Sequence, residues 1–177
     1  MTTNSIKQQV SSWRGKYDFD CPTKSILIRR GRYKINDEVL RLLNVKRDHD
    51  DNLRFPFYNI HNTNYIAGYY EAKLNNQGGF KGLKAAAHDF VYPICLPKVK
   101  FDHEDKVLHL VKTPAQVAEK MSRGENAIAY CYQNKISDRL LHYIISNKVK
   151  EIKAHAKIKD RLEKKLNKAG YYEFKML

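Results

Sequence analysis

Acidic side chains are scarce in this sequence relative to basic ones. The 177 residues include 19 Asp and Glu against 33 Lys and Arg, which gives a formal net charge of +14 at pH 7. An excess of this size attracts polyanions and speeds their capture, whatever the fold of the chain. Nucleic acid is therefore the first partner that the charge predicts.

Long apolar runs are also missing. No stretch approaches the roughly 18 apolar residues that a membrane-spanning helix needs, so we expect no membrane partner. The opening MTTNSIKQQVSSW is polar and lacks the apolar region of a signal peptide, which favours a cytoplasmic protein. Cys21, Cys95 and Cys131 stand far apart without a CxxC pair, which argues against a cysteine-rich zinc site and fits a reducing compartment.

The chain is long enough for one domain with a real core, and 42% of its residues are apolar. We expect a mixed α/β (α+β) fold in which a small sheet packs against helices and a long basic helix closes the chain. The segments are a polar N-terminal part (1–20), an α/β nucleic-acid-binding core (21–135) and a basic amphipathic C-terminal helix (136–177). Richness in Lys, Asn, Ile and Tyr is typical of an AT-rich genome, such as that of a phage or mobile element.

Helix-capping signals and apolar runs place several elements. The apolar run at 25–30 predicts a strand, and Asn36 is a good N-cap for a helix that continues to about Val45. Runs at 90–96 and 107–111 also indicate strands. Thr113, followed by Pro114 and Gln116, predicts a capping box and a helix to about Met121.

Beyond Ser137 the apolar residues recur at the helical period, which predicts one long helix that ends near Gly170. Its lysines should lie outward, along a phosphate backbone or on the solvated face of a dimerising helix. Basic side chains gather in this helix and in residues 24–54. The predicted nucleic-acid contacts are Lys24, Arg29, Arg30, Arg32, Lys34, Arg41, Lys46, Arg47, Arg54, Lys73, Lys81, Lys84, Lys150 and Lys157.

The string YIAGYYEA, residues 65–72, resembles the signature helix of the LAGLIDADG homing endonucleases. The resemblance implies a helix at about 64–72 whose Ala67-Gly68 pair packs against a twin across a dimer axis. It also implies a catalytic acid at Glu71. The family places a second acid, which holds the divalent metal, where this chain has Lys73. The resemblance therefore implies a nuclease scaffold that binds a DNA site without cutting it.

Two further patterns point to other kinds of site. Residues 116–133 are spaced like a helix-turn-helix, in which Asn126, Tyr130 and Gln133 would face the major groove. The clusters at 48–51 and 102–105 mix Asp or Glu with His, and such clusters either bind metal or form solvated turns.

These observations favour a DNA-binding regulator or repressor that binds double-stranded DNA, works without a cofactor and forms a homodimer. One alternative is an active metal-dependent DNA endonuclease, which would need Mg²⁺ and would use Glu71. The other is an RNA-binding or nucleoprotein component, because the 12 tyrosines could stack on unpaired bases.

Overall fold

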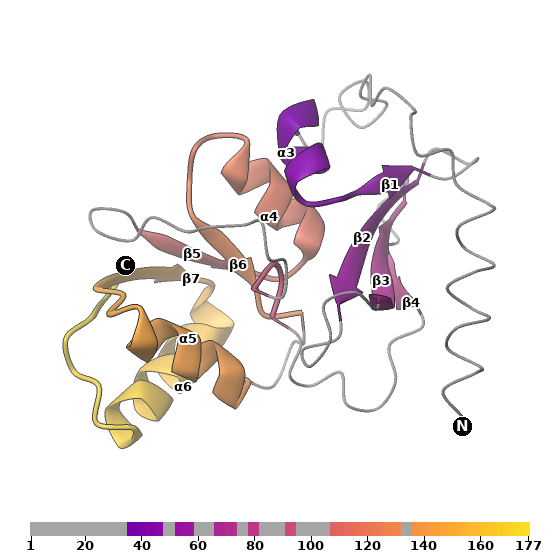
Figure 1. The fold of residues 1–177 in the computed structure, drawn as a ribbon. Helices are drawn as coiled ribbons and strands as arrows, with labels where there is room; N and C mark the ends of the chain where they lie inside the picture. The colour runs from indigo at the N-terminus through magenta and orange to yellow at the C-terminus, as the bar shows by residue number, and fades with distance from the viewer. Residues whose placement is uncertain are drawn as a thin grey trace, which may run out of the picture.

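A computed structural model describes residues 35–47, 52–58, 66–73, 78–81, 91–94, 107–131 and 136–177. Helices combine with two four-stranded sheets, one antiparallel and one parallel, so the predicted mixed α/β class is confirmed (Figure 1). Within these ranges, no helix has the length and apolar character needed to cross a membrane. The predicted strand at 25–30, the polar segment 1–20 and the clusters at 48–51 and 102–105 lie outside the described residues.

The antiparallel sheet follows the short helix α3 (Asp37–Leu42) and runs in chain order. Its strands are β1 (Lys46–Arg47), β2 (Leu53–Tyr58), β3 (Ile66–Ala72) and β4 (Gly79–Lys81). Alternation along β2 explains its orientation, because Leu53, Phe55 and Phe57 are all buried in one core. Arg54 therefore lies on the other face, directly opposite Glu71 of β3.

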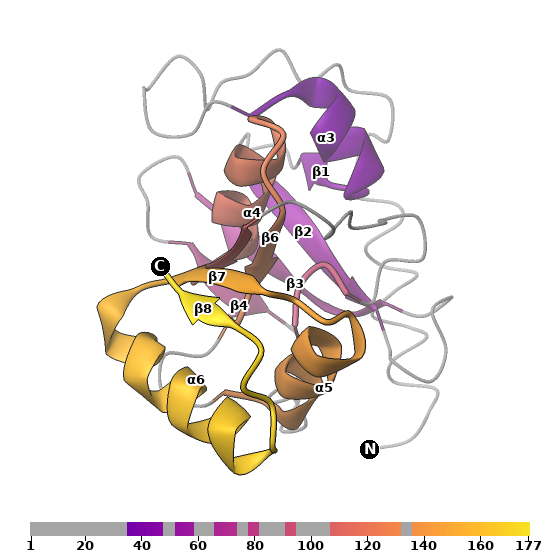
Figure 2. The same ribbon diagram turned by 90° about the vertical axis from the view of Figure 1, so that its left-hand side faces the viewer.

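The parallel sheet is built from the second half of the chain in strict alternation of strands and helices. The elements are β5 (Leu108–Val111), α4 (Pro114–Met121), β6 (Ala127–Ala129), α5 (Asp138–Ser146), β7 (Glu151–Ala154), α6 (Ala156–Lys168) and β8 (Lys175–Met176). The strand order is β6-β5-β7-β8, and every neighbouring pair is parallel. Helices α5 and α6 lie together on one face of this sheet (Figures 1 and 2).

Helix α4 lies between the two sheets and joins them. Its buried residues Ala115, Val117 and Ala118 share one core with α3, the antiparallel sheet and strand β6. A second core lies on the opposite face of the parallel sheet, where Leu140 of α5 and Leu162 of α6 pack against β5 and β7. Strand β6 is thus buried on both faces of the parallel sheet, as its apolar sequence requires, whereas β7 buries only the face toward α5 and α6.

Several elements begin or end where the sequence predicts. The Asn36 side chain accepts a hydrogen bond from the backbone N–H of Glu38 at the start of α3. The Thr113–Gln116 capping box forms at the start of α4, and β5 occupies the predicted strand. Gly170, with φ of 77°, follows the end of α6 in the left-handed conformation.

The prediction of one long C-terminal helix is wrong. Residues 136–177 form two helices with strand β7 between them and strand β8 at the end. Helix α5 ends because Lys148 takes a left-handed conformation, with φ of 50°, and the N–H of Val149 bonds to the carbonyl of Ile144. The position of Ile152 in the sequence fits the helical period, but the residue lies in a strand. It is buried while its neighbours Glu151 and Lys153 are exposed, and this alternation is typical of a strand.

Two other helix predictions are also corrected. The expected signature helix at 64–72 is strand β3, which pairs with β2 and β4 on either side. The resemblance to the LAGLIDADG family therefore gains no support from the fold. The second helix of the proposed helix-turn-helix is strand β6, and buried Tyr130 follows it, so this motif is absent from the described residues 107–131.

Candidate nucleic-acid interface

The carboxyl ends of β5 and β7 form the position where open parallel sheets bind ligands. The chain passes from β5 through α4 to β6 in one direction, and from β7 through α6 to β8 in the other. Neighbouring strands whose following helices diverge in this way make a topological switch point, and ligands bind in the crevice outside it. Here β5 and β7 are those neighbours, with Leu110 paired to Ala154.

Basic side chains line this switch point. Lys112 follows β5, while His155 and Lys157 follow β7, and all three are exposed. We call these three residues the basic edge. No Asp or Glu is present among the described residues that directly follow the four parallel strands, at 112–113, 130–131, 155–157 and 177. The edge therefore presents positive charge and hydrogen-bond donors, and it offers no carboxylate for a metal ion.

Local capping interactions fix the two helix starts beside the basic edge. The Gln116 side chain accepts hydrogen bonds from the backbone N–H groups of Lys112 and Thr113, at 3.0 and 3.1 Å. At α6, the Nδ1 atom of His155 accepts from the backbone N–H of Lys157 at 3.2 Å. This bond assigns the ring proton to Nε2, which leaves a donor available on the far side of the imidazole.

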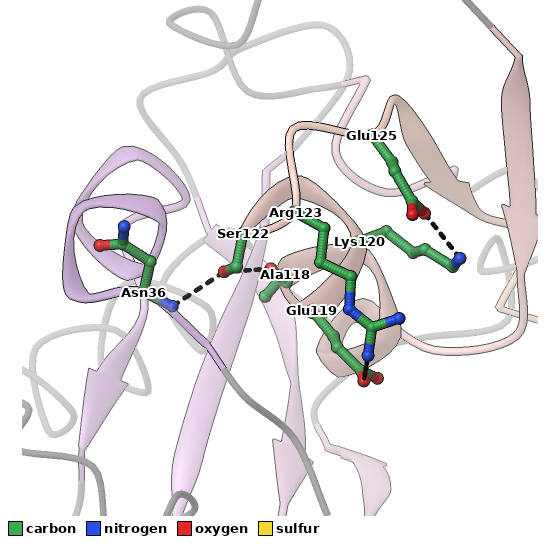
Figure 3. Close-up of polar contacts among 7 residues, drawn as sticks. All are labelled: Asn36, Ala118, Glu119, Lys120, Ser122, Arg123 and Glu125. Carbon is green, nitrogen blue, oxygen red and sulfur yellow. Dashed lines mark hydrogen bonds and ion pairs between the residues drawn. The ribbon is translucent and has the colours of Figure 1, made fainter.

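Acidic side chains near α4 are already paired with bases (Figure 3). Arg123 contacts Glu119 at 2.6 Å, and Lys120 contacts Glu125 at 2.6 Å. The hydrogen bond from Lys120 lowers the pKa of the Glu125 carboxyl, and this effect outweighs the opposing effect of burial. These acids are neutralised within α4 and its C-terminal turn, so they do not offset the charge of Lys112.

The α3–α4 joint in the same view positions this half of the molecule. The backbone N–H of Asn36 donates to Ser122 Oγ at 2.8 Å, and Ser122 Oγ donates to the Ala118 carbonyl at 2.7 Å (Figure 3). The residue that caps α3 is thereby tied to the end of α4. The joint holds the helix that leads away from the basic edge against the antiparallel sheet.

The predicted catalytic acid, Glu71, is buried in the antiparallel sheet among bases. Its side chain lies 3.1 Å from Arg54 and 3.7 Å from Lys73, and the Arg54 guanidinium lies 4.6 Å from the centre of the Tyr69 ring. We call these four residues the Glu71 cluster. The described part of the chain contains no group of His, Cys, Asp or Glu that could hold a metal ion. The single Glu71 carboxylate thus contacts two cations at this position.

The predicted nucleic-acid contacts fall into three groups. Arg41, Lys150 and Lys157 are exposed, and Lys46 and Arg47 are partly buried on β1. Arg54 and Lys73 belong to the Glu71 cluster, and Lys81 lies on β4. The remaining predictions lie outside the described residues: Lys24, Arg29, Arg30, Arg32, Lys34 and Lys84.

The sequence predictions missed Lys112 and His155. Each directly follows a short strand and stands at the start of a helix, and that position is the signal that could have identified them. Recognising it requires the strand-helix alternation of residues 107–177, which the expected single C-terminal helix obscured.

Comparison with protein-family models and with curated protein sequences gives no match. Among solved structures, the chain is similar to the DnaG primase catalytic domain bound to single-stranded DNA (ssDNA), with a TM-score of 0.58 and 11% sequence identity. The match covers 85% of this chain and 62% of that one. At this identity, the likeness is one of fold: this chain shares its arrangement of strands and helices with part of a primase catalytic domain.

Proposed function

We propose that this protein is a DNA-binding regulator that binds DNA without cleaving it. The observation that carries the proposal is the basic edge, formed by Lys112, His155 and Lys157 at the switch point of the parallel sheet. Phosphate groups suit this position because it combines long-range positive potential with exposed N–H donors. The net charge of +14 supports the same class of ligand.

The surroundings of the acids support binding over cleavage. Metal-assisted hydrolysis of a phosphodiester uses carboxylates to hold the metal beside the scissile bond. The described residues that directly follow the four parallel strands supply none, and Glu71 is engaged by Arg54 and Lys73. Incubation with duplex DNA and Mg²⁺ or Mn²⁺ tests this part of the proposal. Robust cutting would favour the endonuclease alternative.

Double-stranded DNA is the first choice of ligand, and single-stranded DNA is a second candidate because the similar primase domain was solved with it. The predicted homodimer depended on a signature helix at 64–72, which β3 replaces, so the proposal includes no dimer. Competition among duplex DNA, single-stranded DNA and RNA at one salt concentration separates the ligands. Tighter binding to RNA than to either DNA would favour the nucleoprotein alternative.

The basic edge is tested by the double variant Lys112→Gln/Lys157→Gln. If both lysines contact duplex phosphates, the slope of log K against log salt becomes shallower by about 1.8. Affinity should also fall by roughly tenfold. Both substitutions keep the backbone N–H groups that the caps use.

A matched control makes the same change in charge at the other end of the parallel strands, where the strands begin. Lys150 precedes β7 and Lys175 begins β8, and both are exposed. The variant Lys150→Gln/Lys175→Gln should retain most of the affinity. Equal losses in both variants would mean that net charge, and no particular edge, governs binding. That result would refute the role of the basic edge.

A further inference from the structure

Helix α6 carries four of its six basic residues on one face. Lys157, Arg161, Lys164 and Lys168 are spaced by four, three and four residues, which aligns them along a helix, and all four are exposed. We call them the α6 stripe. The buried residues Ile158, Leu162 and Leu166 form a separate line that faces the core. At 1.5 Å per residue, the stripe is about 16 Å long.

Three of the four cations in the stripe are not used internally. Lys157, Lys164 and Lys168 make no ion pair with any residue in the part of the chain that the structure describes. Of the two acids in the helix, Asp160 lies beside the stripe, three residues after Lys157 and four before Lys164, while Glu163 is not three or four residues from any stripe residue. The four basic residues therefore outnumber the one acid beside them. The stripe therefore presents a row of positive charge to solvent.

Lys165 shows the contrasting use of a lysine on the same helix. Its Nζ donates to the carbonyl of Ile136 at 2.8 Å and lies 3.8 Å from Asp138, at the start of α5. Lys165 thus joins α6 to α5. The helix is also fixed at its end, where the Tyr171 hydroxyl donates to the Val149 carbonyl at 2.9 Å. The stripe consequently lies on a rigid element.

We propose that the α6 stripe binds the sugar-phosphate backbone of a nucleic acid that also contacts the basic edge. This inference rests on the proposed function and extends it, because Lys157 belongs to both surfaces. The bound strand would run from the switch point along α6. At a rise of 3.4 Å per nucleotide in B-form geometry, the stripe spans about five nucleotides of one strand.

The packing of α6 argues for a nucleic acid over a lipid surface. A helix that binds a membrane interface inserts apolar side chains between the lipids. In α6 the apolar residues point inward, with 3% of Ile158 and none of Leu162 or Leu166 exposed. Binding at this face must therefore use charge and hydrogen bonds, which a regular row of phosphates can satisfy.

The test is the triple variant Arg161→Gln/Lys164→Gln/Lys168→Gln, which leaves the basic edge intact. The slope of log K against log salt should become shallower by about 2.7 on duplex DNA, or about 2.1 on a single strand. Affinity for the same DNA should fall by at least about tenfold, measured by fluorescence anisotropy. Circular dichroism should match the wild type, because no substituted side chain is buried. Urea unfolding measures separately the interaction that Arg161 makes within the chain.

The control variant Lys148→Gln/Lys153→Gln/Lys175→Gln removes three exposed charges from other elements, none of them among the predicted nucleic-acid contacts. It should change the salt slope much less than the stripe variant does. If the wild type binds DNA and the two variants behave alike, the role of the stripe is refuted and the proposed function stands.

Absence of wild-type binding to duplex DNA, single-stranded DNA and RNA would instead overturn the proposed function and this inference together. Vesicles of phosphatidylserine and phosphatidylcholine provide the remaining arm. Binding to such vesicles that is lost in the stripe variant, without any binding to nucleic acid, would assign the stripe to a lipid surface and refute the inference.

Discussion

The Glu71 cluster and the α6 stripe use basic side chains in opposite ways. In the cluster, Arg54 and Lys73 surround a buried acid, and the Arg54 side chain is only 18% exposed. In the stripe, Lys157, Lys164 and Lys168 face solvent without a described acidic partner. The sequence alone predicts nucleic-acid contacts in both regions, at Arg54 and Lys73 and at Lys157. The difference teaches that a basic segment offers charge to a ligand only where the fold leaves that charge uncompensated.

The largest expected effect concerns the Glu71 cluster. Glu71→Gln removes the charge opposite Arg54, and a poorly hydrated guanidinium remains without its counter-charge. The free energy of unfolding should fall by about 2 kcal/mol, below the usual cost of breaking a fully buried pair because both side chains retain some exposure. Urea denaturation at pH 7 provides the measurement.

The matched control is Glu163→Gln on α6, where the acid is exposed. Its free energy of unfolding should stay within about 0.5 kcal/mol of the wild type. Neither substitution should weaken DNA binding, because each raises the net charge by one. If the two variants were equally stable, Glu71 would not compensate the charge of Arg54. The contrast between the Glu71 cluster and the α6 stripe would then be wrong.

A smaller effect separates two adjacent lysines on α6. Lys165→Gln removes the hydrogen bond to the Ile136 carbonyl and should lower the free energy of unfolding by about 0.5–1 kcal/mol. Lys164→Gln should leave stability unchanged and make the salt slope of duplex binding shallower by about 0.9. If Lys165→Gln weakened DNA binding and Lys164→Gln did not, the definition of the stripe, which includes Lys164 and leaves out Lys165, would be wrong.

The smallest effect concerns pH. His109 on β5 is partly buried near Lys120, Glu125 and Lys153. Burial, with repulsion from Lys120, lowers the pKa of the His109 imidazole, while Glu125 opposes the shift. The unfolded chain then binds more protons than the folded one below the ordinary value of about 6.5. The contribution of His109 to stability should therefore fall as pH drops through that value and be constant above it.

The measurement is the free energy of unfolding from pH 5.5 to 8, compared between the wild type and His109→Gln. The variant should show the flatter profile in the acidic half of this range. Glu125 does not confuse the result, because its lowered pKa removes stability only as pH falls below about 4.5. A steeper profile in the variant would contradict the direction of the His109 shift.

Local signals in the sequence were sufficient for the capped helices. Asn36 and Thr113 act through hydrogen bonds to residues two or three positions away, so their effect does not depend on distant packing. Strand β3 was mistaken for a helix because its apolar residues do not alternate cleanly: both faces of Ile66–Ala72 are partly covered, and Glu71 is buried with Tyr70. Burial by distant segments is not visible in a local pattern.

The candidate site was predicted only in part. Lys157 was identified from charge alone, whereas Lys112 and His155 depend on β5 and β7 being neighbours, a pairing between residues more than forty positions apart. The sequence predicts that Arg54 contacts DNA, because its contact with Glu71 depends on the register of β2 against β3, which no local pattern shows. Local patterns predict helix ends well, but they do not predict which charges meet across a sheet.

Helix α4 has a consequence for how the molecule can be divided. Because Val117 and Ala118 are fully buried in a core that both sheets share, a cut between β4 and β5 would expose apolar surface on each piece. Neither half is a self-contained module that could be transplanted or evolve alone. The two sheets should unfold in one cooperative step, and a ligand held by α6 should therefore slow hydrogen exchange at β2 and β3 as well.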